Sequence, residues 1–434
     1  MKLLVFAHVP PPHHGQSYMV QLMLAGYGGD HRKRSHPGAD AAAPGVAHDI
    51  QCYHVNARFS RTLEDIGEFR GAKLFLVLMH CLAAVWCRYR HGVTNFYYIP
   101  APGKKSALYR DWLVMLLCRP FFKHFILHWH AAGLAKWLET AVQIRTRALT
   151  YHLLKRVDLS IVLSECNRAD AEKLLPRRVR VVGNGIPDPC PDFETRIRPR
   201  HRARMAARQK LVRGENLAPA DLAQTGGDPQ RFRVLFLAHC TREKGLFDTL
   251  EGVALANARL ARAKSPLRLH LTVAGEFMNP RERAEFDARI ARADLRNAGG
   301  DPDVSYVGFV SGEAKRRAFA DSDGFCFPTY YYAESFGLVV LEAMAFGLPI
   351  VASRWRSIPE ILGANHPGLL APRDPEQVAT ALLAKITCDE GEAEREQFVK
   401  RFTMEPYLAA LARAMHSIEQ SGDEMSFAPL PRAS

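Results

Sequence analysis

The first 190 residues alternate short apolar runs with longer stretches in which apolar residues recur at helical spacing. Short apolar runs predict buried strands of a parallel sheet, and the longer stretches predict the helices that cover it. The predicted strands are residues 3–7, 51–55, 95–99, 125–128, 159–163 and 179–182. This alternation is typical of an α/β domain with helices on both faces of the sheet.

A second series of the same kind begins at Arg233. Its predicted strands are residues 234–238, 269–274, 304–307, 324–327 and 350–352, and the chain after about Asp374 is helical to Ile418. A chain of 434 residues, 47% of them hydrophobic, can bury two separate cores. The pattern therefore predicts two doubly wound α/β domains in tandem.

Changes in composition suggest the domain boundaries. Residues 30–47 are rich in Gly, Pro, Ala and charge and predict a flexible loop, and a basic segment rich in Pro and Gly separates the two series. We expect a first domain over residues 1–190, a linker over 191–230, a second domain over 231–390, terminal helices over 391–418 and a frayed tail over 419–434.

The charge favours an anionic partner. Lys and Arg number 58 against 45 Asp and Glu, a net charge of +13, and residues 196–213 are the densest cationic segment. Two interpretations of that segment remain open: a solvated helix between the domains, or a contact with anionic lipid headgroups. No aromatic RNA-binding stripe, zinc finger or recognition helix is present, so we expect no nucleic-acid partner.

Cysteine usage and the N-terminus suggest a cytoplasmic protein. The nine cysteines lie singly, without a C-x-x-C pair, which argues for a reducing compartment and against a zinc site. M-K-L-L-V-F-A leads directly into a predicted strand and lacks a signal-peptide cleavage site, and no apolar run is long enough to span a bilayer. We expect a cytoplasmic protein, and a peripheral position at the inner face of the cytoplasmic membrane stays open.

The most informative segment is E-S-F-G-L-V-V-L-E, which Glu334 and Glu342 flank. It follows the predicted strand 324–327 and opens a predicted helix over 336–346, which Gly347 and Pro349 close. The first turn of such a helix attracts an anion, while carboxylates accept hydrogen bonds from the diols of a sugar or ribose. A nucleotide sugar has both parts. The alternative is that Ser335 caps the helix and both glutamates are ordinary helix residues.

Two longer motifs resemble a known family. Residues 327–353, F-P-T-Y-Y-Y-A-E-S-F-G-L-V-V-L-E-A-M-A-F-G-L-P-I-V-A-S, resemble the donor-site motif of family 4 glycosyltransferases, which are retaining enzymes with the GT-B fold. F-L-A-H-C-T-R-E-K-G at residues 236–245 resembles the second marker of that family, a loop whose basic side chains bind the donor diphosphate. The resemblance implies two Rossmann-like domains facing a cleft, with a C-terminal helix crossing back to the first domain.

The resemblance also implies roles for residues of the second domain. Glu342 would bind ribose hydroxyls, Glu334 the hydroxyls of the sugar, and Lys244 the diphosphate. Many members carry an arginine where this chain has His239, so either His239 donates a neutral hydrogen bond or Arg242 supplies the second cation. Gly275, with Glu276, resembles a further cleft element. The remaining donor-site positions are Ser335, Phe336, Gly337, Leu338 and Val339.

In the first domain, Gly15 occupies the place of the family's glycine-rich turn, and His130 that of a histidine near the reacting sugar. The turn at Asn184 and Gly185 matches the family's exit from the first domain. Residues 55–60 and 97–111 resemble a bacterial surface-polysaccharide branch of the family. The acceptor-side candidates there are Arg58, Lys104, Lys105, Arg110 and Asp111.

We therefore expect a retaining GT-B glycosyltransferase that moves a hexosyl group from a nucleotide diphosphate sugar to a hydroxyl of a lipid-linked or growing glycan. Glu334, His130 and Lys244 are the expected catalytic residues. No cofactor and no metal are expected, because the D-S-D at 321–323 precedes a predicted strand instead of following one. A phosphorylase, an epimerase and a catalytically inactive scaffold remain alternatives.

Overall fold

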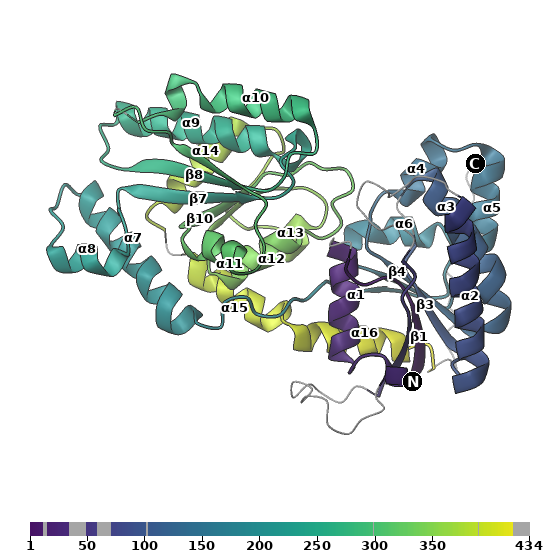
Figure 1. Ribbon diagram of the computed structural model, residues 1–434. Coiled ribbons are helices and arrows are strands. Elements are labelled where there is room, and N and C mark those ends of the chain that lie inside the picture. Colours follow the sequence, from purple (N-terminus) through teal and green to yellow (C-terminus); the bar gives the residue numbers. More distant parts are fainter. Residues whose placement is uncertain are drawn as a thin grey trace, which may run out of the picture. The chain divides into compact units, whose positions relative to one another are not determined.

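The computed structural model describes residues 1–11, 15–33, 49–58, 71–100, 103–297, 299–388 and 390–419 (Figure 1). The chain forms two compact units. Unit 1 comprises Met1–Val182 and the chain from Tyr407, and unit 2 comprises Gly183–Pro406. The loop predicted over residues 34–47 and the tail predicted over residues 420–434 lie outside the described residues.

Unit 1 contains a parallel sheet, which in the described part of the chain has the strand order β2-β1-β3-β4-β5-β6. The strands are β1 (Lys2–Phe6), β2 (Gln51–Val55), β3 (Asn95–Tyr98), β4 (His124–Trp129), β5 (Leu159–Val162) and β6 (Val179–Val181). The helices are α1 (Gly15–Gly26), η1 (His31–Lys33), α2 (Gly71–His91), α3 (Lys105–Cys118), η2 (Arg119–Phe121), α4 (Leu134–Thr140), α5 (Ile144–Leu154), η3 (Glu165–Asn167) and α6 (Arg168–Glu172).

All six strands predicted for this part of the sequence are confirmed to within about two residues at either end. Their side chains are almost entirely buried, because helices cover the sheet on both faces. Figure 1 shows α2, α3 and α5 on one face of the sheet, with α1 and α16 (Met404–His416) on the other.

The crossing of the C-terminal helix is confirmed for α16. The Tyr27 hydroxyl, just after α1, donates to the carbonyl of Leu408 over 2.8 Å, and Leu411 is fully buried. The expectation that all of residues 391–418 pack on the first domain is wrong, however. Helix α15 (Gly391–Arg401) belongs to unit 2, where the Arg395 guanidinium donates to the carbonyl of Ala345 at the end of α12 (Leu338–Ala345) over 2.9 Å.

Unit 2 contains a second parallel sheet, with the order β12-β11-β10-β7-β8-β9 among the described strands. The strands are β7 (Arg231–Leu237), β8 (Arg268–Ala274), β9 (Val304–Gly308), β10 (Gly324–Phe327), β11 (Ile350–Ser353) and β12 (Leu369–Leu370). The helices not yet named are η4 (Phe193–Ile197), α7 (Arg198–Val212), α8 (Pro219–Thr225), η5 (Arg242–Lys244), α9 (Leu246–Arg262), α10 (Pro280–Ile290), η6 (Ala293–Leu295), α11 (Gly312–Ala320), α13 (Ile358–Leu362) and α14 (Pro375–Lys385).

The five strands predicted for the second series are present, and β12 was missed because it is only two residues long. Figure 1 shows α9, α10 and α14 on one face of this sheet and α11, α12 and α13 on the other. The chain enters the sheet at β7, moves outward through β8 and β9, and returns to β10 on the other side of β7. The carboxyl ends of β7 and β10 thus form the topological switch point, where open α/β sheets bind ligands.

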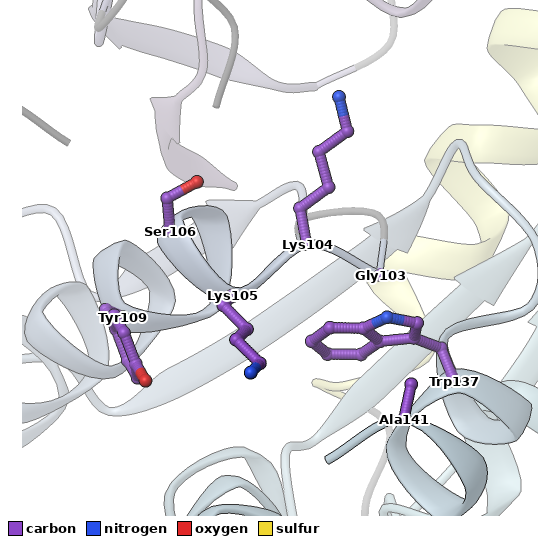
Figure 2. A pocket seen from close by; sticks show the side chains of 7 residues that line it. All are labelled: Gly103, Lys104, Lys105, Ser106, Tyr109, Trp137 and Ala141. Atoms are coloured by element: carbon purple, nitrogen blue, oxygen red, sulfur yellow. The ribbon is translucent and has the colours of Figure 1, made fainter. Parts of the chain in front are cut away.

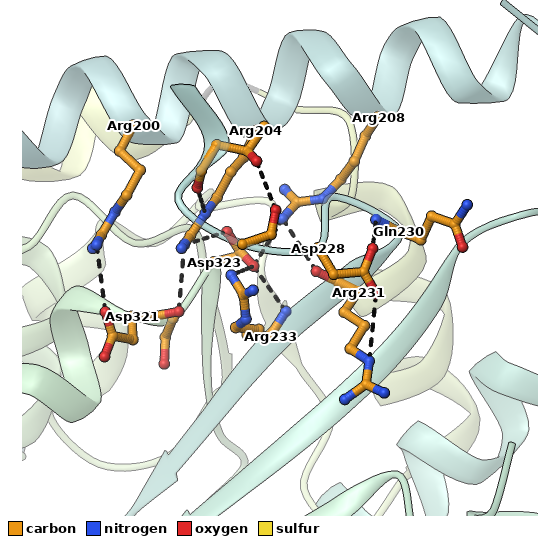
Figure 3. A network of polar contacts seen from close by, with 12 residues as sticks. Arg200, Arg204, Arg208, Asp228, Gln230, Arg231, Arg233, Asp321 and Asp323 are labelled. Carbon is orange, nitrogen blue, oxygen red and sulfur yellow. Dashed lines mark hydrogen bonds and ion pairs between the residues drawn. The ribbon is translucent and has the colours of Figure 1, made fainter. Parts of the chain in front are cut away.

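The segment 191–230, predicted to be a linker, is part of unit 2. Helix α7 is held there by Asp323, whose carboxylate accepts from Arg204 at 3.1 Å and pairs with Arg208 at 2.8 Å (Figure 3). The backbone N–H of Arg233 on β7 also donates to Asp323, over 2.9 Å. Asp323, Arg204 and Arg208 are almost fully buried. This buried cluster of ion pairs and hydrogen bonds connects α7 to β7.

The structure gives no support to the interpretation of residues 196–213 as a lipid-binding basic face. Every Arg and Lys of this described segment has a carboxylate partner within unit 2. The partners are Asp192, Glu194, Asp321, Glu392, Asp323, Asp221 and Glu215. Because these carboxylates neutralise the segment, its charge serves packing within the unit rather than attraction of a distant surface.

Candidate functional site

Two loops of unit 2 meet at its switch point: the loop after β7, which carries η5, and the loop after β10. The backbone N–H of Tyr330 donates to the carbonyl of Glu243 over 2.8 Å. Gly245 has φ +84°, and a Cβ there would lie 2.5 Å from the carbonyl oxygen of Pro328. Only glycine permits both this backbone conformation and this close approach, so the second marker and the donor motif are fixed against each other.

Lys244 and Glu334 face each other across these loops. The Lys244 ammonium donates to Oε2 of Glu334 over 2.6 Å, and the two side chains are 16% and 9% exposed. The ammonium also lies 4.6 Å from the centre of the Tyr331 ring. A positive charge held against an aromatic face and a carboxylate at a switch point can bind a phosphate group and a hydroxyl side by side.

Glu342 lies on α12, with a side chain that is 16% exposed. Its Oε1 accepts from the Lys315 ammonium on α11 over 2.5 Å, while its buried Oε2 has no hydrogen-bond partner. Burial raises the pKa of the Glu342 carboxyl, and Lys315 opposes that rise. A buried acceptor without a donor is costly, which suits an oxygen that a ligand hydroxyl would satisfy.

The backbone between the two glutamates leads into α12. The helix begins at Leu338, two residues later than predicted, and Gly337 precedes it. Glu334 ends a turn in which its N–H donates to the carbonyl of Tyr331 over 3.1 Å. The sequence predictions for Ser335, Phe336, Gly337, Leu338 and Val339 therefore fall on the turn and first residues of α12, the end of a helix that carries partial positive charge.

Of the two candidates for a second cation, neither supplies a free positive charge beside Lys244. The Arg242 guanidinium pairs with Glu285 on α10 and lies 4.4 Å from the centre of the Phe247 ring. Burial and the nearby Lys244 lower the pKa of His239. His239 is therefore mainly neutral at pH 7. Because Arg242 pairs with Glu285 in this conformation, its role as the second cation stays a prediction.

Gly275 directly follows β8 and lies beside the same loop. A Cβ at this position would lie 1.8 Å from the carbonyl oxygen of Ala238, so any side chain would displace the loop that carries His239. The neighbouring Glu276 carbonyl accepts from the N–H of Cys240 over 2.8 Å. Gly275 thus serves the site by letting the loop after β7 pack closely against β8.

In unit 1, the predicted residues lie at the carboxyl edge of the sheet or within the core. His130 directly follows β4, and its ring centre is 4.2 Å from that of His128. His128 is fully buried, with its Nδ1 2.5 Å from the Tyr97 hydroxyl, and burial holds its pKa well below the usual range. Gly15 is the first residue of α1 and Arg58 follows β2.

Arg110 and Asp111 are bound to each other within unit 1. Asp111 is fully buried and accepts from Arg110 over 2.8 Å and from the Tyr98 hydroxyl over 2.6 Å. Such a satisfied buried cluster stabilises the packing of α3 on β3. The prediction that Asp111 faces an acceptor is therefore wrong. Lys104 and Lys105, the other acceptor-side candidates near α3, are exposed.

Lys315 was not singled out from the sequence, although it contacts the predicted site residue Glu342. Lys315 lies on α11, 27 positions before Glu342 in the chain, and no local motif relates the two. Tyr331, whose ring contacts Lys244, stands three residues before Glu334 in the donor motif.

Comparisons with known proteins agree with this geometry. Residues 231–387, which include Lys244, Glu334 and Glu342, match the family described as glycosyl transferases group 1. This part of unit 2 therefore resembles the group 1 glycosyltransferases. The GT-B fold expected from the sequence is also supported over the whole chain by solved structures.

The curated relatives match only parts of the chain. The amylovoran biosynthesis glycosyltransferase AmsK of Erwinia amylovora is 31% identical over 170 residues, 38% of each chain. The O-antigen chain mannosyltransferase B of Escherichia coli is 36% identical over 87 residues, 20% of this chain and 22% of the relative. The matches thus span well under half of these relatives.

Among solved structures, the sucrose-phosphate synthase of Thermosynechococcus elongatus has a TM-score of 0.60 at 18% identity, over 97% of this chain and 100% of that one. Anabaena HepE, in complex with UDP and glucose, has a TM-score of 0.59 at 16% identity, over 95% and 99%. At these identities the likeness establishes the fold.

Proposed function

We propose that this glycosyltransferase moves a hexosyl group from a nucleotide diphosphate sugar to a hydroxyl of a lipid-linked or growing glycan, with retention of configuration. The observation that carries the proposal is the Lys244–Glu334 pair at the switch point, with the unpartnered Oε2 of Glu342 on the adjoining helix α12. A relative that acts in amylovoran biosynthesis and an O-antigen mannosyltransferase support the polysaccharide context. The HepE complexes with UDP and with UDP-glucose support the donor class.

Each group has a role that suits its chemistry. Lys244 would bind the diphosphate and stabilise the charge that develops as the nucleotide leaves. Released from Lys244, Glu334 would accept from sugar hydroxyls, and Glu342 would accept from the ribose diol through Oε2. The backbone N–H groups at the start of α12 would donate to the sugar and phosphate. His130 would line the acceptor side near the reacting carbon.

Retention would follow from the leaving phosphate guiding the acceptor hydroxyl onto the face that it vacates. Retaining glycosidases instead use two carboxyl groups about 5 Å apart, one of them a nucleophile. Glu334 is bound to Lys244 and Glu342 to Lys315, so neither stands ready as a nucleophile in this conformation. An oxocarbenium-like sugar stabilised by fixed charges is the simpler route.

The proposed diphosphate site works without a metal ion. The D-S-D motif at residues 321–323 is the candidate for bridging a metal and a diphosphate. Both of its carboxylates form ion pairs with arginines of unit 2. Asp321 pairs with Arg200 and Asp323 with Arg204 and Arg208 (Figure 3). With both carboxylates engaged by arginines, Lys244 and the start of α12 are left to neutralise the diphosphate.

A nucleotide-sugar screen tests the proposed function. Release of nucleotide from UDP, GDP and ADP sugars would be measured with and without a lipid-linked sugar acceptor, each in the presence and absence of EDTA. We expect release with one nucleotide class, stimulated by the acceptor and unchanged by EDTA. Release with no donor would refute the glycosyltransferase proposal, and full loss in EDTA restored by magnesium would refute metal independence.

The raised pKa of Glu342 predicts how nucleotide affinity depends on pH. Ribose hydroxyls donate to the carboxylate, so a protonated Glu342 must lose its proton to bind. Affinity for the nucleotide should therefore fall as pH decreases, beginning above the ordinary range of a glutamate. Glu342→Gln should bind about tenfold to a hundredfold more weakly at pH 7, the cost of a charged hydrogen bond. Its affinity should also depend less on pH.

Isothermal titration of the nucleotide from the screen checks this prediction. Glu313→Gln, at an exposed glutamate on α11, is the matched control and should bind like the unmodified protein. If Glu342→Gln lowers the melting temperature sharply while the folded protein binds nucleotide normally, Glu342 is structural.

The proposed lipid-linked acceptor requires access to a membrane, and α2 offers the surface for it. Its inner face, with Val77, Cys81 and Ala84, is buried in the core of unit 1. Its outer face carries large apolar side chains that are 39% to 69% exposed, at the spacing of a helical stripe: Phe75, Leu78, Met79, Leu82, Trp86 and Tyr89. No described helix is both long and apolar enough to cross a bilayer.

Such a stripe suits a helix lying in the lipid interface. Trp and Tyr side chains favour the headgroup level, and Arg88 and Arg90 in the last turn of α2 can attract anionic lipid. We therefore place the proposed peripheral membrane contact on α2 and not on the neutralised segment 196–213.

Leu82→Gln with Trp86→Gln should weaken binding to anionic vesicles by about tenfold or more, since each buried apolar side chain contributes about 1.5 to 3 kcal/mol. The melting temperature should be nearly unchanged because both side chains are exposed. Vesicle co-sedimentation measures the effect. Arg198→Gln with Arg202→Gln, on α7, is the control and should bind vesicles normally. Normal binding by the α2 variant and weakened binding by the α7 variant would assign the membrane contact to α7.

A further inference from the structure

A cavity of about 560 Å³ opens in unit 1 at the start of α3 (Figure 2). Its size is within the range of small-molecule sites. The residues that line it are Gly103, Lys104, Lys105, Ser106, Tyr109, Trp137 and Ala141. None of them has a role in the donor site of unit 2.

The cavity lies where the fold of unit 1 places ligands. One wall comes from the start of α3, which follows β3, and the other from α4, which follows β4. These strands are parallel neighbours, so both walls belong to the carboxyl edge of the sheet. His130 stands at the same edge, four residues before α4 begins. Ligands of doubly wound sheets bind outside this edge.

The charge in the cavity is not neutralised. Lys104 and Lys105 are exposed, and within the part of the chain that the structure describes no carboxylate forms an ion pair with either. The basic helix α7, by contrast, has a carboxylate for each arginine and lysine. Figure 2 shows the Lys105 side chain reaching between Tyr109 and Trp137, while Lys104 extends away from the indole. An anion placed beside Lys105 would also meet the positive end of α3.

The aromatic wall is held in place. A Cβ on Gly103 would lie 2.6 Å from Cγ of Trp137, so the backbone at Gly103 packs directly against the indole. The backbone N–H of Trp137 donates to the carbonyl of Gly133 over 3.0 Å, which anchors the first turn of α4 that carries the indole. A rigid aromatic face binds the apolar C–H face of a sugar ring at little entropic cost, and the hydroxyls at the ring edge stay in water.

We propose that this cavity binds a sugar ring that carries an anionic group, as the recognition site for the acceptor. The ring would lie against Trp137 and the anion beside Lys105. This assignment to the acceptor rests on the proposed function, because the donor groups are in unit 2. The anion has two possible sources: the phosphate that joins a glycan to its lipid, or the carboxylate of a uronic acid in the glycan.

Titration with small sugars tests the proposal. Glucose-1-phosphate, glucuronic acid and glucose would be titrated into the full chain with the nucleoside diphosphate identified by the screen present at saturation, so that the donor site is filled. We expect one or both anionic sugars to bind roughly tenfold or more tightly than glucose, the contribution of a charged contact. Preference for the phosphate indicates the lipid-linked source, and preference for the carboxylate indicates the uronic acid.

Variants locate the binding. Lys105→Met should reduce the affinity for the anionic sugars to that for glucose, and Trp137→Leu should weaken all three. Lys136→Met, at an exposed lysine on α4 outside the cavity, is the matched control and should change nothing. Gly103→Ala, which would push on the indole, should weaken binding while Lys105 is intact. Melting curves verify that the variants are folded.

Equal affinity for the charged and neutral sugars, or an unchanged affinity in Lys105→Met, would overturn the proposal. Nucleotide release in the screen above should be the same in Lys136→Met as in the unmodified protein. If instead no donor is turned over but Lys105-dependent sugar binding remains, the glycosyltransferase proposal fails and the cavity stands as a sugar site.

Discussion

Lys244→Met is expected to lower turnover by about a hundredfold to a thousandfold, the effect of removing one preorganised charge from a developing anion. It should also destabilise the protein by roughly 3 kcal/mol, because Glu334, only 9% exposed, would be left as an unpaired buried charge. Initial rates of nucleotide release and thermal melting measure the two effects separately.

The double variant Lys244→Met with Glu334→Gln separates catalysis from stability. Removing both charges leaves no unpaired ion, so most of the lost stability should return while turnover stays low. Recovery of turnover in the double variant would mean that Lys244 only balances Glu334. As a control, Lys264→Met changes a lysine after α9 that has no place in the site and should affect neither property.

Asp323→Ala is expected to destabilise unit 2 by about 3 to 5 kcal/mol, because Arg204 and Arg208 would both remain buried without their carboxylate. The melting temperature should fall by roughly 10 °C or more. Asp323→Asn keeps the shape of the side chain but not its charge. Its melting temperature should lie between those of Asp323→Ala and the unmodified protein.

An exposed ion pair on the same helix gives the comparison. Arg202→Ala breaks the contact with Glu392, where the side chains are 56% and 31% exposed, and should cost less than about 1 kcal/mol. Equal effects of Asp323→Ala and Arg202→Ala would contradict the view that α7 is fixed to the sheet by a buried cluster. Residues 196–213 would then behave as the linker predicted from composition.

The strands and the donor motif could be predicted because their signals are local. Each strand is a continuous apolar run bounded by turn residues. Because both faces of these sheets are buried, successive side chains of a strand are mostly apolar. Glu334 and Glu342 lie in one segment with Gly337 between them, so their joint placement needs only one turn and one helix. The short β12 was missed because two residues carry no period.

The ion-pair partners of the charged side chains could not be predicted in the same way. Arginine density indicates a basic surface only if no carboxylate reaches it, and Asp321, Asp323 and Glu392 lie more than a hundred residues from their partners on α7. Likewise, Arg242 stands in the loop of Lys244, yet its guanidinium pairs with Glu285 on α10. Local spacing says nothing about these contacts.

The sequence by itself determined the two α/β series, the strand boundaries and the segment that carries Glu334 and Glu342, because each depends on hydrophobic period and turn chemistry within a few dozen residues. Only the tertiary structure decided that Lys244 meets Glu334, that Lys315 leaves one oxygen of Glu342 unpartnered, and that α7 is a buried clamp while α2 exposes an apolar stripe. These outcomes depend on which distant elements the sheet order brings together, and therefore on which charges are paired and which surfaces are covered.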